Sequence, residues 1–109
     1  MGSDAASDPT LETLRRDAMA VMAVRPDDWD EKGLLRAVAL LLRAGNAMQV
    51  AGPIQEGLAV YERAEYLAGR AGLRSERLTA LLGLASCCIQ LGEYGRAEQV
   101  LHTARGLAK

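Results

Sequence analysis

Three side chains carry a thiol or an imidazole, the groups that most often bind transition metals or act as strong nucleophiles: Cys87, Cys88 and His102. Adjacent residues on a helix point about 100° apart, so Cys87 and Cys88 are badly placed for a structural disulfide. The chain has no Cys-x-x-Cys spacing and His102 is its only histidine, so a metal or redox site lacks further ligands. We therefore expect two buried thiols that pack as small hydrophobes, no metal and no cofactor. Reduced cysteines weakly favour a cytoplasmic location.

Carboxylates, the usual groups for acid–base catalysis, cluster before an apolar segment at Asp27, Asp28, Asp30 and Glu31. Negative charge at the start of a helix favours the positive end of the helix dipole, which explains this cluster without catalysis. The glycine-containing segments 69–72 and 92–95 follow helical patterns, not strands, so neither is typical of a phosphate-binding loop. We expect His102 on the exposed side of the last helix. The sequence thus predicts that the protein is not an enzyme.

The amino-acid composition narrows the classes of protein to which the chain could belong. Of 109 residues, 50% are apolar, only 4% are aromatic and none is Phe, so one domain with a core of Leu, Ala, Val and Met is expected. The net charge of −1 lacks the basic excess of a nucleic-acid-binding surface. No uninterrupted apolar run reaches about 18 residues, so no membrane span is predicted. Residues 1–9 have no signal-peptide pattern and are expected to be disordered.

Apolar spacing and breaker residues predict an all-α chain. The first helix covers residues 10–25, with Asp8 or Thr10 as N-cap, and the second follows the carboxylate cluster and ends at Gly52-Pro53. The third runs from Ile54 to Ala71, the fourth from Glu76 to Leu91 with Ser75 as its cap, and the fifth from Tyr94 to Leu107. Trp29, the single tryptophan, has two interpretations: a packing anchor or an exposed contact residue.

The second half of the chain resembles the first at an offset of 40 residues. Residues 78–109 align on residues 38–69, with identities at Leu41 and Leu81, Leu42 and Leu82, Gly52 and Gly92, Val60 and Val100, Ala64 and Ala104, Leu67 and Leu107, and Ala68 and Ala108. Self-similarity at a period of about 20–50 residues is typical of stacked helical repeats.

Particular positions carry a family resemblance. The second copy reads Leu81-x-x-Leu84-Ala85-x-x-Cys88, Gly92-Glu93-Tyr94 and Ala97-x-x-x-Leu101-x-x-Ala104. The first reads Leu41-x-x-Ala44-Gly45-x-x-Met48, Gly52 and Gly57-x-x-x-Tyr61-x-x-Ala64. This pattern resembles the tetratricopeptide repeat, although Leu replaces the family's Trp at 41 and 81 and the closing Pro is absent. The resemblance implies a short α-solenoid, with a capping helix at 10–25 and repeats at 28–72 and 75–109.

In that family the first helix of each pair lines a concave groove. The resemblance therefore implies a partner-binding groove formed by Ala39, Leu42, Asn46, Gln49, Val50, Thr79, Leu82, Ser86, Ile89 and Gln90. An apolar groove with a few amides suits an amphipathic helix or an extended apolar segment, whose backbone the amides would bind. Leu42 and Leu82 occupy positions where a carboxylate clamp needs a basic residue. The alternative is that these leucines belong to the core.

Three functional hypotheses remain open. The first is a protein-interaction module, a small adaptor or escort chaperone that resembles the small chaperones of bacterial secretion systems. The second is a self-associating module, such as a homodimer, whose edge is formed by Val100, Leu101, Ala104 and Leu107. The third is a regulatory segment of a larger sensor or transcriptional regulator.

Overall fold

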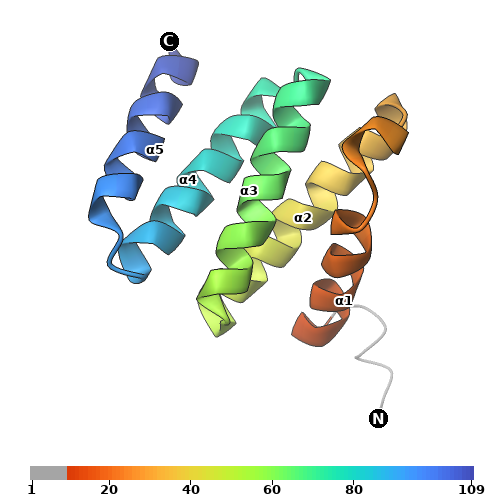
Figure 1. Ribbon diagram of the computed structural model, residues 1–109, viewed down its shortest axis with the longest axis horizontal. Helices are drawn as coiled ribbons and strands as arrows, with labels where there is room; N and C mark the ends of the chain where they lie inside the picture. Colours follow the sequence, from red (N-terminus) through yellow and green to blue (C-terminus); the bar gives the residue numbers. More distant parts are fainter. Residues whose placement is uncertain (1–9) are drawn as a thin grey trace.

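The computed structural model describes residues 10–109, which form a stack of five α-helices without strands (Figure 1). The helices are α1 (Leu11–Met22), α2 (Glu31–Ala51), α3 (Ile54–Ala71), α4 (Arg74–Gln90) and α5 (Tyr94–Ala108), with a short 3₁₀ turn, η2 (Pro26–Asp28), between the first two. The prediction of an all-α helical stack is confirmed. The predicted disorder of residues 1–9 lies outside the described residues.

Two of the helices begin with a side-chain cap. The Thr10 hydroxyl accepts a hydrogen bond from the Thr13 amide at 3.1 Å, and the Asp30 carboxylate accepts one from the Gly33 amide at 2.7 Å. Such caps satisfy amides that the first turn of a helix leaves free. The predicted cap at Ser75 is wrong: α4 starts at Arg74, two residues before the predicted start at Glu76, and it follows Leu73, which makes no side-chain cap.

Glycines with positive φ reverse the chain after α3 and α4. Gly72 has φ 70° and Gly92 has φ 79°, a region that only glycine enters readily. The next amide in each case, from Leu73 or Glu93, donates back to a carbonyl in the last turn, Ala68 or Cys88, at 2.9 and 2.8 Å. Because these connections are short, successive helices pack as antiparallel neighbours.

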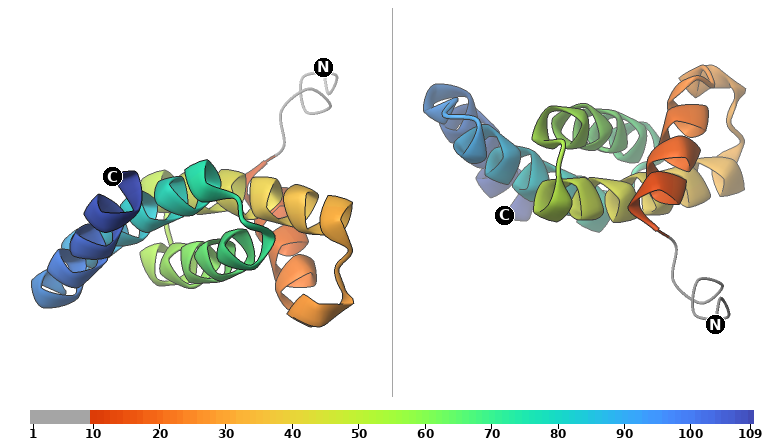
Figure 2. Two further views of the ribbon diagram at one scale, coloured as in Figure 1. Left: turned by 90° about the horizontal axis from the view of Figure 1, so that it is seen from above. Right: turned by 90° about the horizontal axis from the view of Figure 1, so that it is seen from below.

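The stack has two ends and a double-layered middle. Helices α2 and α4 lie side by side, and α3 packs against both (Figure 2). Helix α1 covers one end, where Leu14 and Ala18 are buried against the residues of α2, and α5 lies at the other end against α4.

The core consists mainly of small aliphatic side chains. Nine of the twenty buried apolar residues are alanine, so the helix backbones approach closely and little volume is left for aromatic rings. Leu, Val and Met supply most of the remainder, as the composition predicts. Tyr61 is the exception, because it is the largest fully buried side chain and lies at 1% exposure.

Trp29 packs beside α2. Its ring lies against the core, and a β-carbon at Gly33 would come within 2.8 Å of its Cε3 atom. The indole nitrogen is buried and has no hydrogen-bond partner among residues 10–109. These contacts favour the packing-anchor interpretation.

Helix α2, with 21 residues, is the longest helix of the described residues. Among the helices of residues 10–109 it alone is long and apolar enough to cross a membrane, with a mean hydropathy of 1.2 over its best window. It also contacts α1, α3 and α4, and it buries Ala37, Val38, Leu41, Ala44 and Met48. Packing against three helices accounts for part of this apolar composition, whereas one side of α2 stays exposed.

Candidate functional site

The ten residues of the predicted groove all lie on the neighbouring helices α2 and α4, and none of them is buried. On each helix most of them are three or four positions apart, which keeps them on one side. Leu35, which the sequence reasoning missed, precedes Ala39 by four residues and is 49% exposed. We call these ten residues together with Leu35 the α2–α4 face.

Large apolar side chains are concentrated on this face. Leu35 on α2 and Leu82 and Ile89 on α4 are each about half exposed, and Val50 at the end of α2 is 90% exposed. They are four of the eight large hydrophobic residues that are exposed within residues 10–109. Single exposed hydrophobes are common on protein surfaces, whereas several on one surface make that surface a candidate for interaction.

Leu42 and Leu82, which the sequence leaves open as core or contact residues, differ in burial. Leu42 is partly buried and packs against the buried residues of both core clusters, whereas Leu82 is 50% exposed. The core interpretation therefore fits Leu42, and the contact interpretation fits Leu82.

A hydrogen-bond network that starts at the buried Tyr61 holds three polar residues of the face in place. The Tyr61 hydroxyl donates to Oδ1 of Asn46 and lies 3.2 Å from Oε1 of Gln49, and Nε2 of Gln49 donates to the Ser86 hydroxyl. The network links α3, α2 and α4. Two of the amides expected to bind a partner's backbone are thus partly occupied within the protein, whereas Gln90 takes no part in this network.

Tyr61 reaches the face by passing between two glycines. A β-carbon at Gly45 on α2 would lie 2.9 Å from the ring, and one at Gly83 on α4 would lie 2.3 Å from it. Burial, with a smaller contribution from the neighbouring Cys87, raises the pKa of the Tyr61 phenol to about 12. The sequence reasoning missed this arrangement. A glycine inside a helix costs about 1 kcal/mol relative to alanine, so Gly83 was the available signal of a close approach.

The cysteines, the histidine and most of the carboxylates that were candidates for chemistry are buried, exposed on α5, or engaged in helix caps and ion pairs. Cys87 and Cys88 are fully buried, as predicted, and burial raises the pKa of both thiols. His102 is exposed, as predicted. Of the carboxylates, Asp30 caps α2, Asp27 pairs with Arg70 at 2.5 Å, and Asp28 pairs with Arg25 at 3.1 Å.

The predicted oligomer edge on α5 is not a continuous exposed surface. Ala104 is 3% exposed, and Val100 packs against the cluster of Tyr61, Leu84 and Cys87. These two residues face inward because α5 uses its apolar side to pack on α4. Leu107 is partly buried, and Leu101, at 36%, is the one large apolar residue of the four that is exposed.

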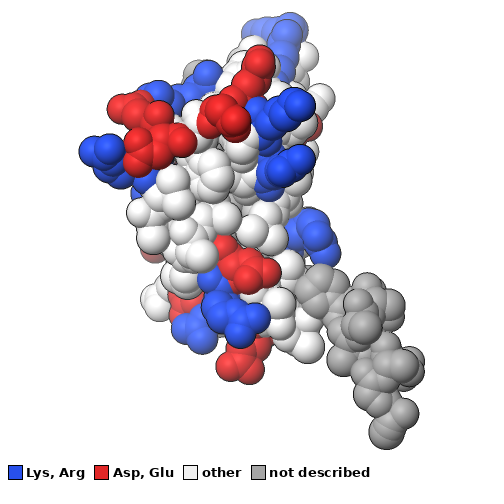
Figure 3. Space-filling model, turned by 90° about the vertical axis from the view of Figure 1, so that its right-hand side faces the viewer, with Lys and Arg blue, Asp and Glu red and all other residues white. Residues whose placement is uncertain are grey.

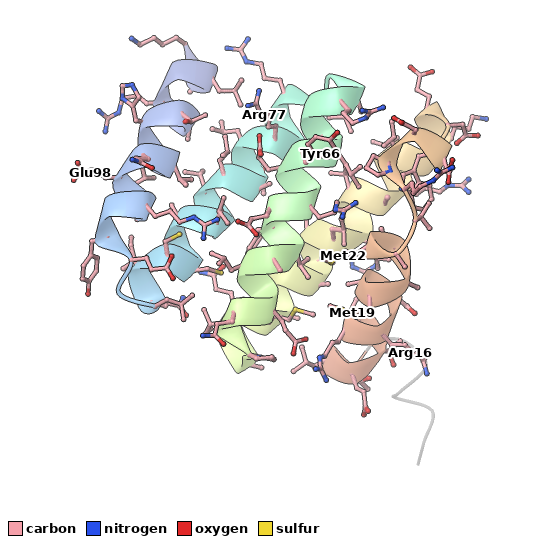
Figure 4. The ribbon with its side chains drawn as sticks, in the orientation of Figure 1. Arg16, Met19, Met22, Tyr66, Arg77 and Glu98 are labelled. Carbon is pink, nitrogen blue, oxygen red and sulfur yellow. The ribbon has the colours of Figure 1, made fainter. Side chains whose placement is uncertain are left out.

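A smaller apolar surface lies where α1 meets α3. Met22 of α1 and Tyr66 of α3 line a shallow hollow there, and Met19 lies further along α1 (Figure 4). The Arg70 guanidinium lies 5.8 Å from the centre of the Tyr66 ring and is also held by Asp27. This cation therefore already occupies one face of the ring.

The chain matches no protein-family model, and neither a curated protein nor a solved structure is significantly similar to it. The candidate site therefore depends on the chain's own residues and geometry.

Proposed function

We propose that this protein is a tetratricopeptide-like interaction module that binds an apolar helix or extended segment of another protein on the α2–α4 face. It would act in the cytoplasm as a small adaptor or escort chaperone, of the kind found in bacterial secretion systems. The 40-residue internal similarity and the antiparallel pairs α2–α3 and α4–α5 support the repeat assignment.

The observation that carries the proposal is the exposure of Leu35, Val50, Leu82 and Ile89 on one surface of two adjacent helices. Burying these side chains against a partner stabilises a complex by removing apolar area from water. Helix α4 has 17 residues and is therefore about 25 Å long, which suits a partner helix of about five turns.

The self-association hypothesis has less support. Its edge depends on four residues of α5, and Ala104 and Val100 are already used inside the protein. Of the large side chains exposed on α5, Tyr94 and Leu101 are apolar, and the others are polar: Glu98, Gln99, His102, Thr103 and Arg105. We therefore place the binding surface on α2 and α4 and not on α5.

The test uses helical peptides selected from a displayed library against the full chain. Their affinities are then measured by fluorescence anisotropy for the wild type, Leu82→Asp and a control, Leu101→Asp, which introduces the same charge on α5. We expect Leu82→Asp to weaken binding about tenfold or more, and Leu101→Asp to change it by less than about twofold. Circular dichroism verifies that both variants are folded, since both side chains are exposed in the wild type.

Two results would overturn the proposal. One is a set of selected peptides whose affinity falls with Leu101→Asp and not with Leu82→Asp. The other is the absence of any selected peptide that binds the folded wild type.

A further inference from the structure

The charges beside the α2–α4 face are mostly of one sign. The acidic residues of α2 and α4 are Glu31 and Glu76, and each lies in the first turn of its helix. The middle and the C-terminal part of both helices therefore carry no carboxylate. A partner on this face meets no negative charge from these two helices beyond their first turns.

Basic residues, by contrast, run along one side of α2. Lys32, Arg36 and Arg43 are exposed, and within residues 10–109 none of them forms an ion pair. Arg36 and Arg43 are seven residues apart, so they lie on the same side of the helix about 10 Å from each other. Figure 3 shows basic side chains in a row along one edge of the α1–α2 end of the molecule. We call Lys32, Arg36 and Arg43 the basic rim.

The rim borders the apolar face directly. Arg36 follows Leu35, and Arg43 follows Leu42, so each cation is turned about 100° from an apolar residue of the face. The other two arginines near the start of α4 are already engaged. Arg77 pairs with Glu65 at 2.7 Å, and Arg74 donates to the carbonyl of Leu107 at 2.8 Å.

Resting on the proposed function, we propose that the partner of the α2–α4 face is an acidic amphipathic helix of another protein. Its apolar side would cover Leu35, Leu82 and Ile89, and carboxylates on one flank would pair with Arg36 and Arg43. Carboxylates two helical turns apart match the spacing of these two arginines. Charge complementarity of this kind selects the partner and sets its orientation more than it adds affinity.

The experiment compares two designed helical peptides with the same stripe of leucines, one flanked by Glu and the other by Lys at identical positions. Binding to the full chain is measured by anisotropy at low salt, about 0.05 M, and at about 0.5 M, where exposed charges are screened. We expect the wild type to prefer the Glu peptide about tenfold at low salt and to lose most of that preference at high salt.

The deciding variant is Arg36→Glu with Arg43→Glu, which is expected to reverse the preference. The control is Arg16→Glu with Arg105→Glu, which makes the same change in net charge on exposed residues of α1 and α5. Arg16 lies on α1, on a different helix from the rim (Figure 4). We expect this control to keep the wild-type preference.

The remaining outcomes separate this inference from the proposed function. Equal binding of both peptides that is lost with Leu82→Asp would overturn the acidic partner and leave the interaction face in place. Binding that is unaffected by Leu82→Asp would overturn both. A dimer in light scattering that dissociates on Leu82→Asp would mean that a second copy covers the face, which also overturns the inference.

Discussion

A β-carbon on Gly83 would lie 2.3 Å from the Cζ atom of Tyr61, well inside van der Waals contact. The Tyr61 ring, from α3, therefore occupies the space that any larger residue at position 83 of α4 would need. This contact sets how closely α2, α3 and α4 approach, because Gly45 of α2 lies on the ring as well.

The first prediction concerns this contact. Gly83→Ala is expected to lower the free energy of unfolding by about 1–3 kcal/mol, because overpacking outweighs the gain of about 1 kcal/mol in helix propensity. The control is Gly106→Ala on α5, where an added β-carbon meets nothing within 4 Å and is expected to stabilise slightly. Urea unfolding followed by circular dichroism measures both, and equal stability of Gly83→Ala and wild type would contradict the prediction.

The second prediction concerns the Tyr61 hydroxyl. Tyr61→Phe keeps the ring and removes the hydrogen bond to Asn46, so a loss of about 1 kcal/mol is expected. The pKa of the phenol rises from 10.0 to about 12 on folding. Between pH 10 and 12 the folded state keeps a proton that the unfolded state loses, so stability falls as the pH rises through this range.

The matched measurement is urea unfolding at several pH values from 9 upward. The wild type should lose stability more steeply above pH 10 than Tyr61→Phe, which has no phenol to titrate. Parallel curves for the two proteins would exclude Tyr61 as the source of the pH dependence.

The third prediction concerns the thiols. Cys87 and Cys88 are fully buried and their pKa values are raised, so both should react slowly with a disulfide reagent at pH 8 in the folded protein. Both should react rapidly in denaturant. The control is Ile89→Cys, which adds a thiol next in sequence at a position that is 48% exposed in the wild type and should react at once. Fast reaction of either native thiol would show that the α4 core opens readily.

The fourth prediction concerns Trp29. Trp29→Ala is expected to cost about 2 kcal/mol, somewhat below the value for a fully buried ring, because Trp29 is partly exposed. Trp29→Phe should cost less, since the indole nitrogen has no hydrogen-bond partner among residues 10–109 to lose. Thermal unfolding followed by far-ultraviolet circular dichroism compares them. Equal losses for both variants would mean that the indole itself, and not an aromatic ring in general, is required.

Much of the fold follows from local signals in the sequence. Apolar spacing, the carboxylates before the second helix and the break at Gly52-Pro53 are properties of neighbouring residues, so they predict the bounds of α2 and α3 to within a few residues. The cap of α4 was mistaken because Ser75 has the right residue type, yet the chain was already helical at Arg74. Serine within a first turn and serine at a cap have the same sequence signature.

The candidate site was also only partly predictable from the sequence. Helical spacing and the family resemblance put ten residues on the sides of two helices, and their common absence of burial agrees with that placement. Which of them remain free was not readable from the sequence. Asn46 and Gln49 accept from the Tyr61 hydroxyl, which is 12 or more residues distant along the chain, and Ser86 accepts from Gln49.

The sequence by itself thus determined the helices, their order and the pairing of antiparallel neighbours, because these depend on short-range periodicity and short connections. Only the tertiary structure decided that Tyr61 passes between Gly45 and Gly83, that Leu42 is partly covered while Leu82 is exposed, and that Ala104 faces inward. These outcomes depend on how three or more helices share the same volume. Close packing lets one side chain fill a gap only by excluding another, and that competition has no signature in the spacing of residues along a single helix.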